Sequence, residues 1–301
     1  MPKKISFPYW SLSLPSPNTM FEKLKTQELN ITTDKNGNPV LNRIYPYDYL
    51  VCDHLSNHFT EKIRISCRFA DKPTPEEVWE KIKDTDEFKK LNNNVEKREF
   101  IYNATKECNT FNVTFCLWLI NSLVGSNKYI LDPSSGWGDR MIASIASEAA
   151  AYHGYDPNTK LRSGYKKIEQ TFPSNTEIQI KYIPFEKAKI TLNYDLAITS
   201  PPYFNLEKYS TDNTQSIVKY PTYNEWLYNF YYPYIMKLID SVKSDGYIVI
   251  YIENIRSDNV EYKLRDATIE IVNRTNSVKN HTQYGLQIGR NIRYALVWQK
   301  K

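Results

Sequence analysis

Residues 129–140 read YILDPSSGWGDR, and this stretch decides the fold class. Its first four residues form a short apolar run that closes on Asp132, as a buried strand does. Two glycines follow in a tight turn, and glycine allows backbone to pass close beneath a bound ligand. The chain holds nine glycines, of which four cluster at positions 125, 136, 138 and 154. The stretch therefore predicts a strand, a close-fitting turn and the start of a helix.

The chain after about residue 100 alternates short apolar runs with helical stretches, which is typical of a parallel sheet between two layers of helices. The expected strands span 129–132, 151–156, 177–183, 194–199, 246–251, 278–288 and 292–298. The expected helices span 139–150, a stretch from 157 onward, 223–241 and 260–273. The predicted fold class is α/β, a doubly wound, seven-stranded Rossmann-like sheet whose last two strands form an antiparallel edge hairpin.

The first hundred residues differ in composition from the rest and are rich in proline, asparagine and charged side chains. Residues 34–39 carry a turn signal that suggests a hairpin or loop. Thr74 and Pro75 suit the start of a helix that runs through Ile82. We therefore expect residues 1–99 to form an accessory region, a candidate for target recognition, and residues 100–301 to form the main domain.

Composition limits the class of protein only weakly. The formal net charge of +5 and the isoelectric point near 8.7 suit a polyanionic partner, yet many proteins of this size are equally basic. The 24 tyrosines and 6 tryptophans can stack on bases, although most such rings pack within the protein. Arg290, Arg293, Lys300 and Lys301, near the closing hairpin, are candidates for phosphate contacts, or are simply solvated.

The four cysteines lack C-x-x-C spacing, so neither a disulfide framework nor a metal site is expected. No apolar stretch is long enough to cross a bilayer, and no long apolar run follows the N-terminus. We expect an intracellular protein, in the cytoplasm or nucleus, that is neither secreted nor bound to a membrane. The oligomeric state stays open.

The glycine turn lacks the third glycine of G-x-G-x-x-G, and the phosphate-cradling G-x-x-x-x-G-K-[ST] is absent too. It can bind a ligand or serve as a plain tight connection. Asp156, one strand further on, is suited to accept hydrogen bonds from the two ribose hydroxyls of an adenosyl group. It also suits a helix N-cap, and both roles can hold at once.

Residues 199–203 read TSPPY and directly follow an apolar run. Two consecutive prolines remove two backbone donors and fix the turn, which leaves rigid carbonyl acceptors. Ser200 adds another acceptor, and Tyr203 offers a ring on which a base can stack. A proline pair can also be a simple strand terminator. Because ligands of open α/β sheets bind beyond the carboxyl ends of the strands, we expect this turn and the glycine turn to meet.

Together these two motifs resemble the cofactor-binding and catalytic motifs of the S-adenosylmethionine-dependent DNA amino-methyltransferases, over roughly residues 100–301. The resemblance implies a Rossmann-like methyltransferase sheet, S-adenosylmethionine as cofactor and no metal. It assigns catalysis to Ser200, Pro201, Pro202 and Tyr203. It assigns cofactor binding to Thr110, Phe111, Asp132, Ser134, Gly136, Trp137, Gly138, Asp156, Phe185, Glu186 and Thr199. Trp137 and the pair Asp139-Arg140 depart from the small residues usual in the family, and Trp137 is expected to pack on the cofactor or partly fill its site.

The Ser-Pro-Pro-Tyr form resembles the cytosine-N4 enzymes more than the adenine-N6 enzymes. The implied partner is nucleic acid, DNA ahead of RNA. The implied mechanism flips a base out, or takes it from a single strand, and directs its amino nitrogen at the methyl group without a covalent enzyme intermediate. Two alternatives stay open, an RNA base methyltransferase and a non-catalytic nucleic-acid-binding subunit that retains the fold.

Overall fold

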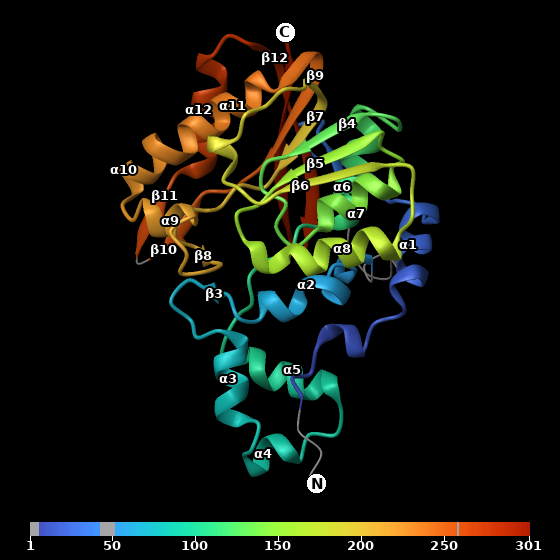
Figure 1. The fold of residues 1–301 in the computed structure, drawn as a ribbon, viewed down its shortest axis with the longest axis vertical. Helices are drawn as coiled ribbons and strands as arrows, with labels where there is room; N and C mark the ends of the chain where they lie inside the picture. The colour runs from blue at the N-terminus through green and yellow to red at the C-terminus, as the bar shows by residue number, and fades with distance from the viewer. Residues whose placement is uncertain (1–5, 43–51, 258) are drawn as a thin grey trace.

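A nine-stranded sheet forms the centre of the protein (Figure 1), seen in a computed structural model that describes residues 6–42, 52–257 and 259–301. The strands follow the order β1-β2-β12-β13-β9-β7-β4-β5-β6 across the sheet. Their bounds in that order are Ile31–Thr33, Pro39–Leu41, Val278–Ile288, Asn291–Lys300, Val242–Tyr251, Tyr194–Thr199, Tyr129–Asp132, Ala151–Tyr155 and Glu177–Lys181.

Five neighbouring strands, from β6 to β9, run parallel to one another. β13 lies antiparallel between β9 and β12, so the closing hairpin is built into the sheet. Chain order reverses at β4, whose neighbours are β5 on one side and β7 on the other. The topology confirms the predicted fold class, a doubly wound Rossmann-like α/β sheet, and extends the seven predicted strands by the β1-β2 hairpin.

Alternating side chains along each central strand build the two faces of the sheet, because successive residues of a strand point to opposite sides. Ile130 and Val249 belong to one core, and their neighbours Leu131 and Ile250 belong to the other. Helices α6 (Val113–Leu123), α7 (Asp139–Ala146) and α8 (Arg162–Thr171) cover the first face. Helices α11 (Tyr232–Asp240) and α12 (Leu264–Arg274) cover the second. This double cover explains why the strands are nearly continuous apolar runs.

Several predicted boundaries shift in the structure. Helix α7 ends at Ala146, four residues early, because Glu148 adopts a left-handed φ of 56°. The stretch after Pro157 begins as a 3₁₀ turn, Thr159–Leu161, before α8. Strand β9 begins at Val242, and the third predicted strand ends at Lys181. Val260–Tyr262, the predicted start of a helix, instead forms β11, which pairs with β10 (Ile255–Ser257).

The helix predicted over 223–241 is not uniform. It consists of α10 (Tyr223–Trp226), a π turn over Leu227–Tyr231, and α11. Pro233 explains the interruption, because proline lacks the N–H of the helical ladder and its ring clashes with the preceding turn. The wider turn accommodates the proline without breaking the helix.

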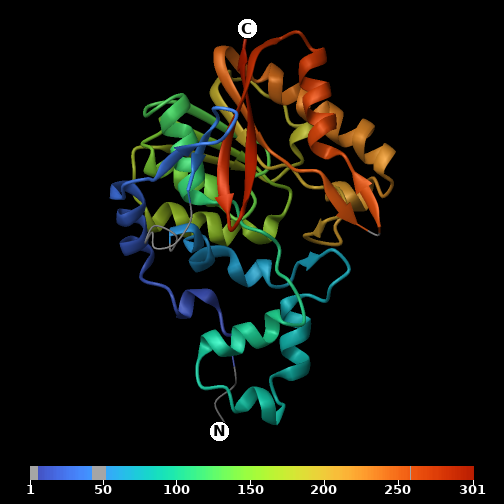
Figure 2. The ribbon, with the colours of Figure 1, turned by 180° about the vertical axis from the view of Figure 1, so that it is seen from behind.

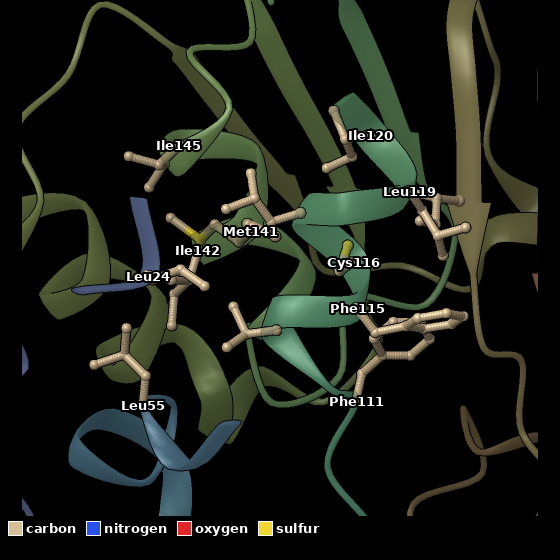
Figure 3. Packing of buried hydrophobic residues seen from close by; sticks show 14 of the residues in the cluster. Leu24, Leu55, Phe111, Phe115, Cys116, Leu119, Ile120, Met141, Ile142 and Ile145 are labelled. Carbon is tan, nitrogen blue, oxygen red and sulfur yellow. The ribbon is translucent and has the colours of Figure 1, made fainter. Parts of the chain in front are cut away.

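Residues before position 100 divide between two cores. The β1-β2 hairpin pairs with β12, and α1 (Pro17–Thr26) and α2 (Asn57–Arg64) pack on the helices of the first face. Figure 3 shows Leu24 and Leu55 in the same core as Ile142 of α7. In contrast, α3 (Pro75–Ile82), α4 (Asp86–Lys89) and α5 (Asn94–Tyr102) project as a lobe away from the sheet (Figures 1 and 2). Phe7, Ile65, Val78, Phe88 and Ile101 form the lobe's own core.

The four cysteines are buried with free thiols. Burial raises the pKa of the Cys52 thiol to about 12, so this sulfur is not a nucleophile at neutral pH. Among the residues that the structure describes, no helix combines the length and apolar character needed to span a membrane.

Glu61 of α2 is a buried acid at the junction of the sheet and the lobe. Its side chain is 1% exposed and accepts a hydrogen bond from the Trp10 backbone N–H at 2.8 Å. Burial raises the pKa of Glu61 to about 7, although the Trp10 bond and Arg64 oppose the shift. Protonation of Glu61 therefore favours the folded state.

We expect this acid to make stability pH-dependent in a defined window. Its contribution is complete below the ordinary pKa of 4.5 and is lost as the pH rises through about 7. The shift corresponds to roughly 3 kcal/mol in total. Urea unfolding at pH 5.5 and at pH 8 measures how much the free energy of unfolding falls between these pH values. This fall should be smaller for Glu61→Gln than for the wild type. Because all other acids are common to both proteins, parallel losses would contradict the assignment.

Candidate active site

A cavity of about 960 Å³ opens at the carboxyl ends of the central strands. Its volume lies at the upper end of the range of ligand pockets. The residues after β4, β5, β6, β7 and β9 all contribute to its lining. Of the predicted site residues, it is lined by Thr110, Phe111, Ser134, Gly136, Trp137, Asp156, Phe185, Glu186, Ser200, Pro201, Pro202 and Tyr203. Asp132, Gly138 and Thr199 lie behind this lining.

Glycine is required at two points of the turn after β4. Gly136 and Gly138 have φ angles of 56° and 93°, in the left-handed region. A Cβ on Gly138 would also lie 2.5 Å from Ile168 Cδ1 of α8. The Gly136 carbonyl accepts a hydrogen bond from the Tyr165 hydroxyl at 2.6 Å, which anchors the turn to α8. The turn can therefore lie flat against that helix while facing the cavity.

Asp132 shapes the turn through a buried ion pair. Its Oδ2 lies 2.8 Å from Arg140 Nε and accepts a hydrogen bond from the Tyr152 hydroxyl at 2.7 Å. Arg140 also donates to the Ser134 carbonyl. Although burial disfavours its charge, Asp132 raises the pKa of Arg140 above its ordinary value. Arg140 replaces the small residue of the motif that this sequence resembles, and its bonds to Asp132 and Ser134 hold the turn in its observed shape.

Trp137 forms part of the cavity wall, and its side chain is 6% exposed. Its indole Nε1 donates to the Asn109 carbonyl at 2.9 Å, and its ring packs edge-to-face on Tyr209. The contact holds the segment before α6 beside the glycine turn. Thr110 and Phe111 reach the cavity for this reason.

Asp156 faces the cavity at the end of β5. Its Oδ2 accepts from the Gly136 N–H at 2.9 Å, and its Oδ1 accepts from the Asn158 N–H at 2.8 Å. The N-cap role predicted for Asp156 belongs instead to Asn158, whose side chain accepts from the Lys160 N–H at 3.2 Å, while Asp156 lines the cavity. Burial raises the pKa of Asp156 to about 6.

Phe185 and Glu186 lie in the short turn after β6, Phe185–Lys187. The Phe185 ring packs edge-to-face against Tyr155 and Tyr234. Glu186 Oε2 is buried and has no hydrogen-bond partner among the described residues. Burial raises the pKa of Glu186. A buried acceptor without a donor is costly, so this oxygen is a candidate to meet a ligand.

The turn after β7 is rigid and directed at the same cavity. Tyr203 donates from its hydroxyl to the Tyr251 carbonyl at 2.9 Å, and burial raises the pKa of Tyr203 well above the ordinary value. Phe204, the next residue, has a left-handed φ of 49° and is 4% exposed. Such strained backbone persists only where the surroundings enforce it. Here Tyr223, Trp226 and Tyr262 pack around the Phe204 ring.

Tyr234 of α11 joins the two turns directly. Its hydroxyl oxygen lies 2.9 Å from Thr199 Oγ1 and 2.9 Å from Ser134 Oγ. Sequence reasoning missed this residue because tyrosine at an apolar helical position suggests core packing. The same reasoning missed Arg140 as a shaping residue.

A two-stranded ribbon closes one side of the cavity, in which β3 (Arg68–Phe69) pairs with β8 (Glu207–Lys208). Glu207 Oε1 accepts from the backbone N–H and the side-chain amide of Asn109, each at 2.8 Å. Its Oε2 accepts from the Tyr209 hydroxyl at 2.7 Å. This wall therefore depends on residues from before and after the glycine turn.

No family model and no curated protein matches the chain. Among solved structures, TrmN from Thermus thermophilus matches with a TM-score of 0.44 and 12% identity, over 64% of this chain and 49% of its own. An rRNA methylase from Streptococcus thermophilus matches with a TM-score of 0.43 and 13% identity, over 64% of this chain and 98% of its own. A third match is the 1,6-didemethyltoxoflavin-N1-methyltransferase of Burkholderia thailandensis with bound S-adenosylhomocysteine, with a TM-score of 0.43 and 11% identity, over 62% of this chain and 76% of its own. This chain spans about half the length of TrmN, and likenesses this distant do not identify its activity.

The Tyr234 hydroxyl should stabilise the fold measurably. Tyr234→Phe leaves the buried Thr199 hydroxyl and the half-buried Ser134 hydroxyl without this partner, and we expect a loss of about 1–2 kcal/mol in the free energy of unfolding. Tyr228→Phe, at a side chain that is 67% exposed, is the matched control and should change stability little. Chemical denaturation of both variants checks this. Equal stabilities would show that the bridge contributes nothing.

Proposed function

We propose that this protein is an S-adenosylmethionine-dependent methyltransferase acting on the exocyclic amino group of a nucleic-acid base. One observation carries the proposal: the glycine turn after β4 and the Ser-Pro-Pro-Tyr turn after β7 line a single cavity. They are adjacent because β4 and β7 are paired in the sheet. A methyl donor bound on the glycine turn would face a methyl acceptor bound at the Ser-Pro-Pro-Tyr turn.

The acids on the glycine-turn side of the cavity support a cationic cofactor. Asp139, Asp156 and Glu186 line it, and burial raises the pKa of each. A cation would favour their ionised forms, whereas a phosphate group would repel them. S-adenosylmethionine carries a sulfonium, an ammonium and a carboxylate group, so its net charge is positive, and it has no phosphate. The missing phosphate-binding glycine pattern agrees with this choice.

The residues present fit each part of that cofactor. The glycine turn would support its methionine portion, together with Thr110 and Phe111. Asp156 would accept hydrogen bonds from the ribose hydroxyls, and Phe185 would lie against the adenine ring. The unpaired Glu186 Oε2 supplies an acceptor for the adenine amino group, whose N–H would satisfy it.

When bound, S-adenosylmethionine supplies a methyl group activated by its positive sulfur. Ser200 and the Pro201 carbonyl accept hydrogen bonds from the base amino group and so direct the nitrogen lone pair toward the methyl carbon. Tyr203 stacks on the base, with its ring oriented by the bond to the Tyr251 carbonyl. Catalysis rests mainly on this positioning. The form of the motif favours cytosine N4 in DNA as the first substrate to test, with RNA as the second.

Substitution of the acceptor turn should separate chemistry from cofactor binding. We expect Ser200→Ala and Tyr203→Ala to lose methyl transfer by at least about 100-fold, because correct positioning supplies much of the rate. Calorimetry should show nearly unchanged cofactor affinity. Tyr228→Ala serves as the exposed control. Retained turnover in both variants would overturn the assigned roles.

The substrate can be identified with labelled cofactor and separate pools of single-stranded DNA, duplex DNA and RNA, digested to nucleosides after reaction. Label in N4-methylcytosine from DNA supports the first candidate, and label in a ribonucleoside supports the second. Cofactor binding without transfer to any pool would contradict a nucleic-acid substrate. Failure to bind the cofactor would favour a non-catalytic subunit.

Asp156 should make cofactor binding pH-dependent. The ionised carboxylate accepts the ribose hydroxyls, so affinity should fall as the pH drops through about 6 and level off above pH 7. Asp156→Asn should bind more weakly, with that dependence removed. The control is Asp139→Asn, because burial also raises the pKa of Asp139 to about 6. The measurement is the dissociation constant of the cofactor between pH 5 and 8. Loss of the pH dependence in Asp139→Asn alone would reject the role of Asp156.

A further inference from the structure

Three cations line the cavity on the side of the acceptor turn. Lys106, Arg256 and Arg293 belong to the lining, and two of them lie on β10 and β13, beyond the end of β9. In the strand order, β13 lies on the opposite side of β7 from β5 and β6. Glu207 and Glu253 line the cavity on this side too, and burial raises the pKa of both acids. The cations therefore border the acceptor turn together with two buried acids.

The three cations come from distant parts of the sequence. Lys106 lies between α5 and α6, with its ammonium 4.1 Å from the centre of the Phe69 ring. Partial burial lowers the pKa of Lys106, Glu207 opposes this shift, and Arg293 adds to it. Lys106 therefore lies near both an acid and a like charge.

Nearby acids do not form ion pairs with these cations. Among the described residues, none of the three cations lies within ion-pair distance of a carboxylate. Both oxygens of Glu207 already accept hydrogen bonds from Asn109 and Tyr209. Exposed arginines on strand ends are often simply solvated. Arg256 and Arg293 differ because they line the same cavity as Lys106, whose ammonium lies over the Phe69 ring.

We propose that Lys106, Arg256 and Arg293 bind the phosphodiester groups of a single-stranded nucleic acid on either side of the target base. This inference rests on the proposed function and adds the site that holds the strand. Arginine forks match phosphate oxygens, and Phe69 and Tyr203 offer rings beside the backbone path. Three cations on three segments around one opening fit a chain that carries repeated charges.

The test measures binding of fluorescent single-stranded DNA and RNA 12-mers by anisotropy at several salt concentrations. The variant combines Lys106→Gln, Arg256→Gln and Arg293→Gln. The control combines Lys35→Gln, Lys166→Gln and Lys167→Gln, which remove the same charge from exposed positions outside the cavity lining. We expect at least a tenfold loss of affinity in the cavity variant and little loss in the control.

The salt dependence should change as well. Each lost phosphate contact lowers the slope of log affinity against log salt by about 0.7 for a single strand, so the slope should fall by roughly 2. Equal affinities and slopes in the two triple variants would overturn the inference. So would inorganic phosphate that competes as strongly as the 12-mer, because the site would then hold a small anion. A stronger effect with one of the two strands identifies which nucleic acid supplies the phosphates.

The same variants separate this inference from the proposed function. The cavity variant should keep its affinity for S-adenosylmethionine and its kcat at saturating strand, with a raised KM. If the wild type binds the strand through these cations but transfers no methyl group, the proposed function fails and the phosphate site stands. If transfer occurs and the cavity variant keeps its KM, the phosphate site fails alone.

Discussion

The buried ion pair between Asp132 and Arg140 is the constraint on which the rest of the site depends. It fixes the end of β4 to the first turn of α7, so the glycine turn between them has one shape. Two charges taken out of water are stable only when their remaining hydrogen-bonding groups are satisfied. Tyr152 and the Ser134 carbonyl supply those partners. From Ser134 the hydrogen-bond network continues through Tyr234 to Thr199, so it connects the glycine turn to the strand that precedes the Ser-Pro-Pro-Tyr turn.

Sequence alone could predict the sheet and the two principal turns, because buried strands appear as short apolar runs in the sequence. Residues 194–199 are apolar enough on both faces to mark a central strand; the prolines mark the end of this strand, and the glycines mark the end of its neighbour β4. The wall made by β3 and β8 left no such trace, since two-residue strands carry no periodicity. Tyr234 was hidden for a different reason, because its ring packs in the core while only its hydroxyl joins the turns. The predicted accessory region likewise gave no sign that Leu24 and Leu55 belong to the main core.

Charged groups of both signs line the cavity. Asp156 and Glu186 lie on the side of the glycine turn, whereas Arg256 and Arg293 lie beyond β9 together with Glu253. A positive ligand beside Asp156 and Glu186 would favour their ionised forms and so relieve the cost of their burial.

The position of β13 between β9 and β12 has a consequence for biosynthesis. This strand is translated after both of its neighbours, yet it must insert between them and pair with each. Until it does, the growing polypeptide presents two unsatisfied strand edges, which are templates for misassociation. Arg293 lies on this strand, so a partly translated chain cannot display a complete opening. The nine strands therefore become one continuous sheet only after β13 has been synthesised.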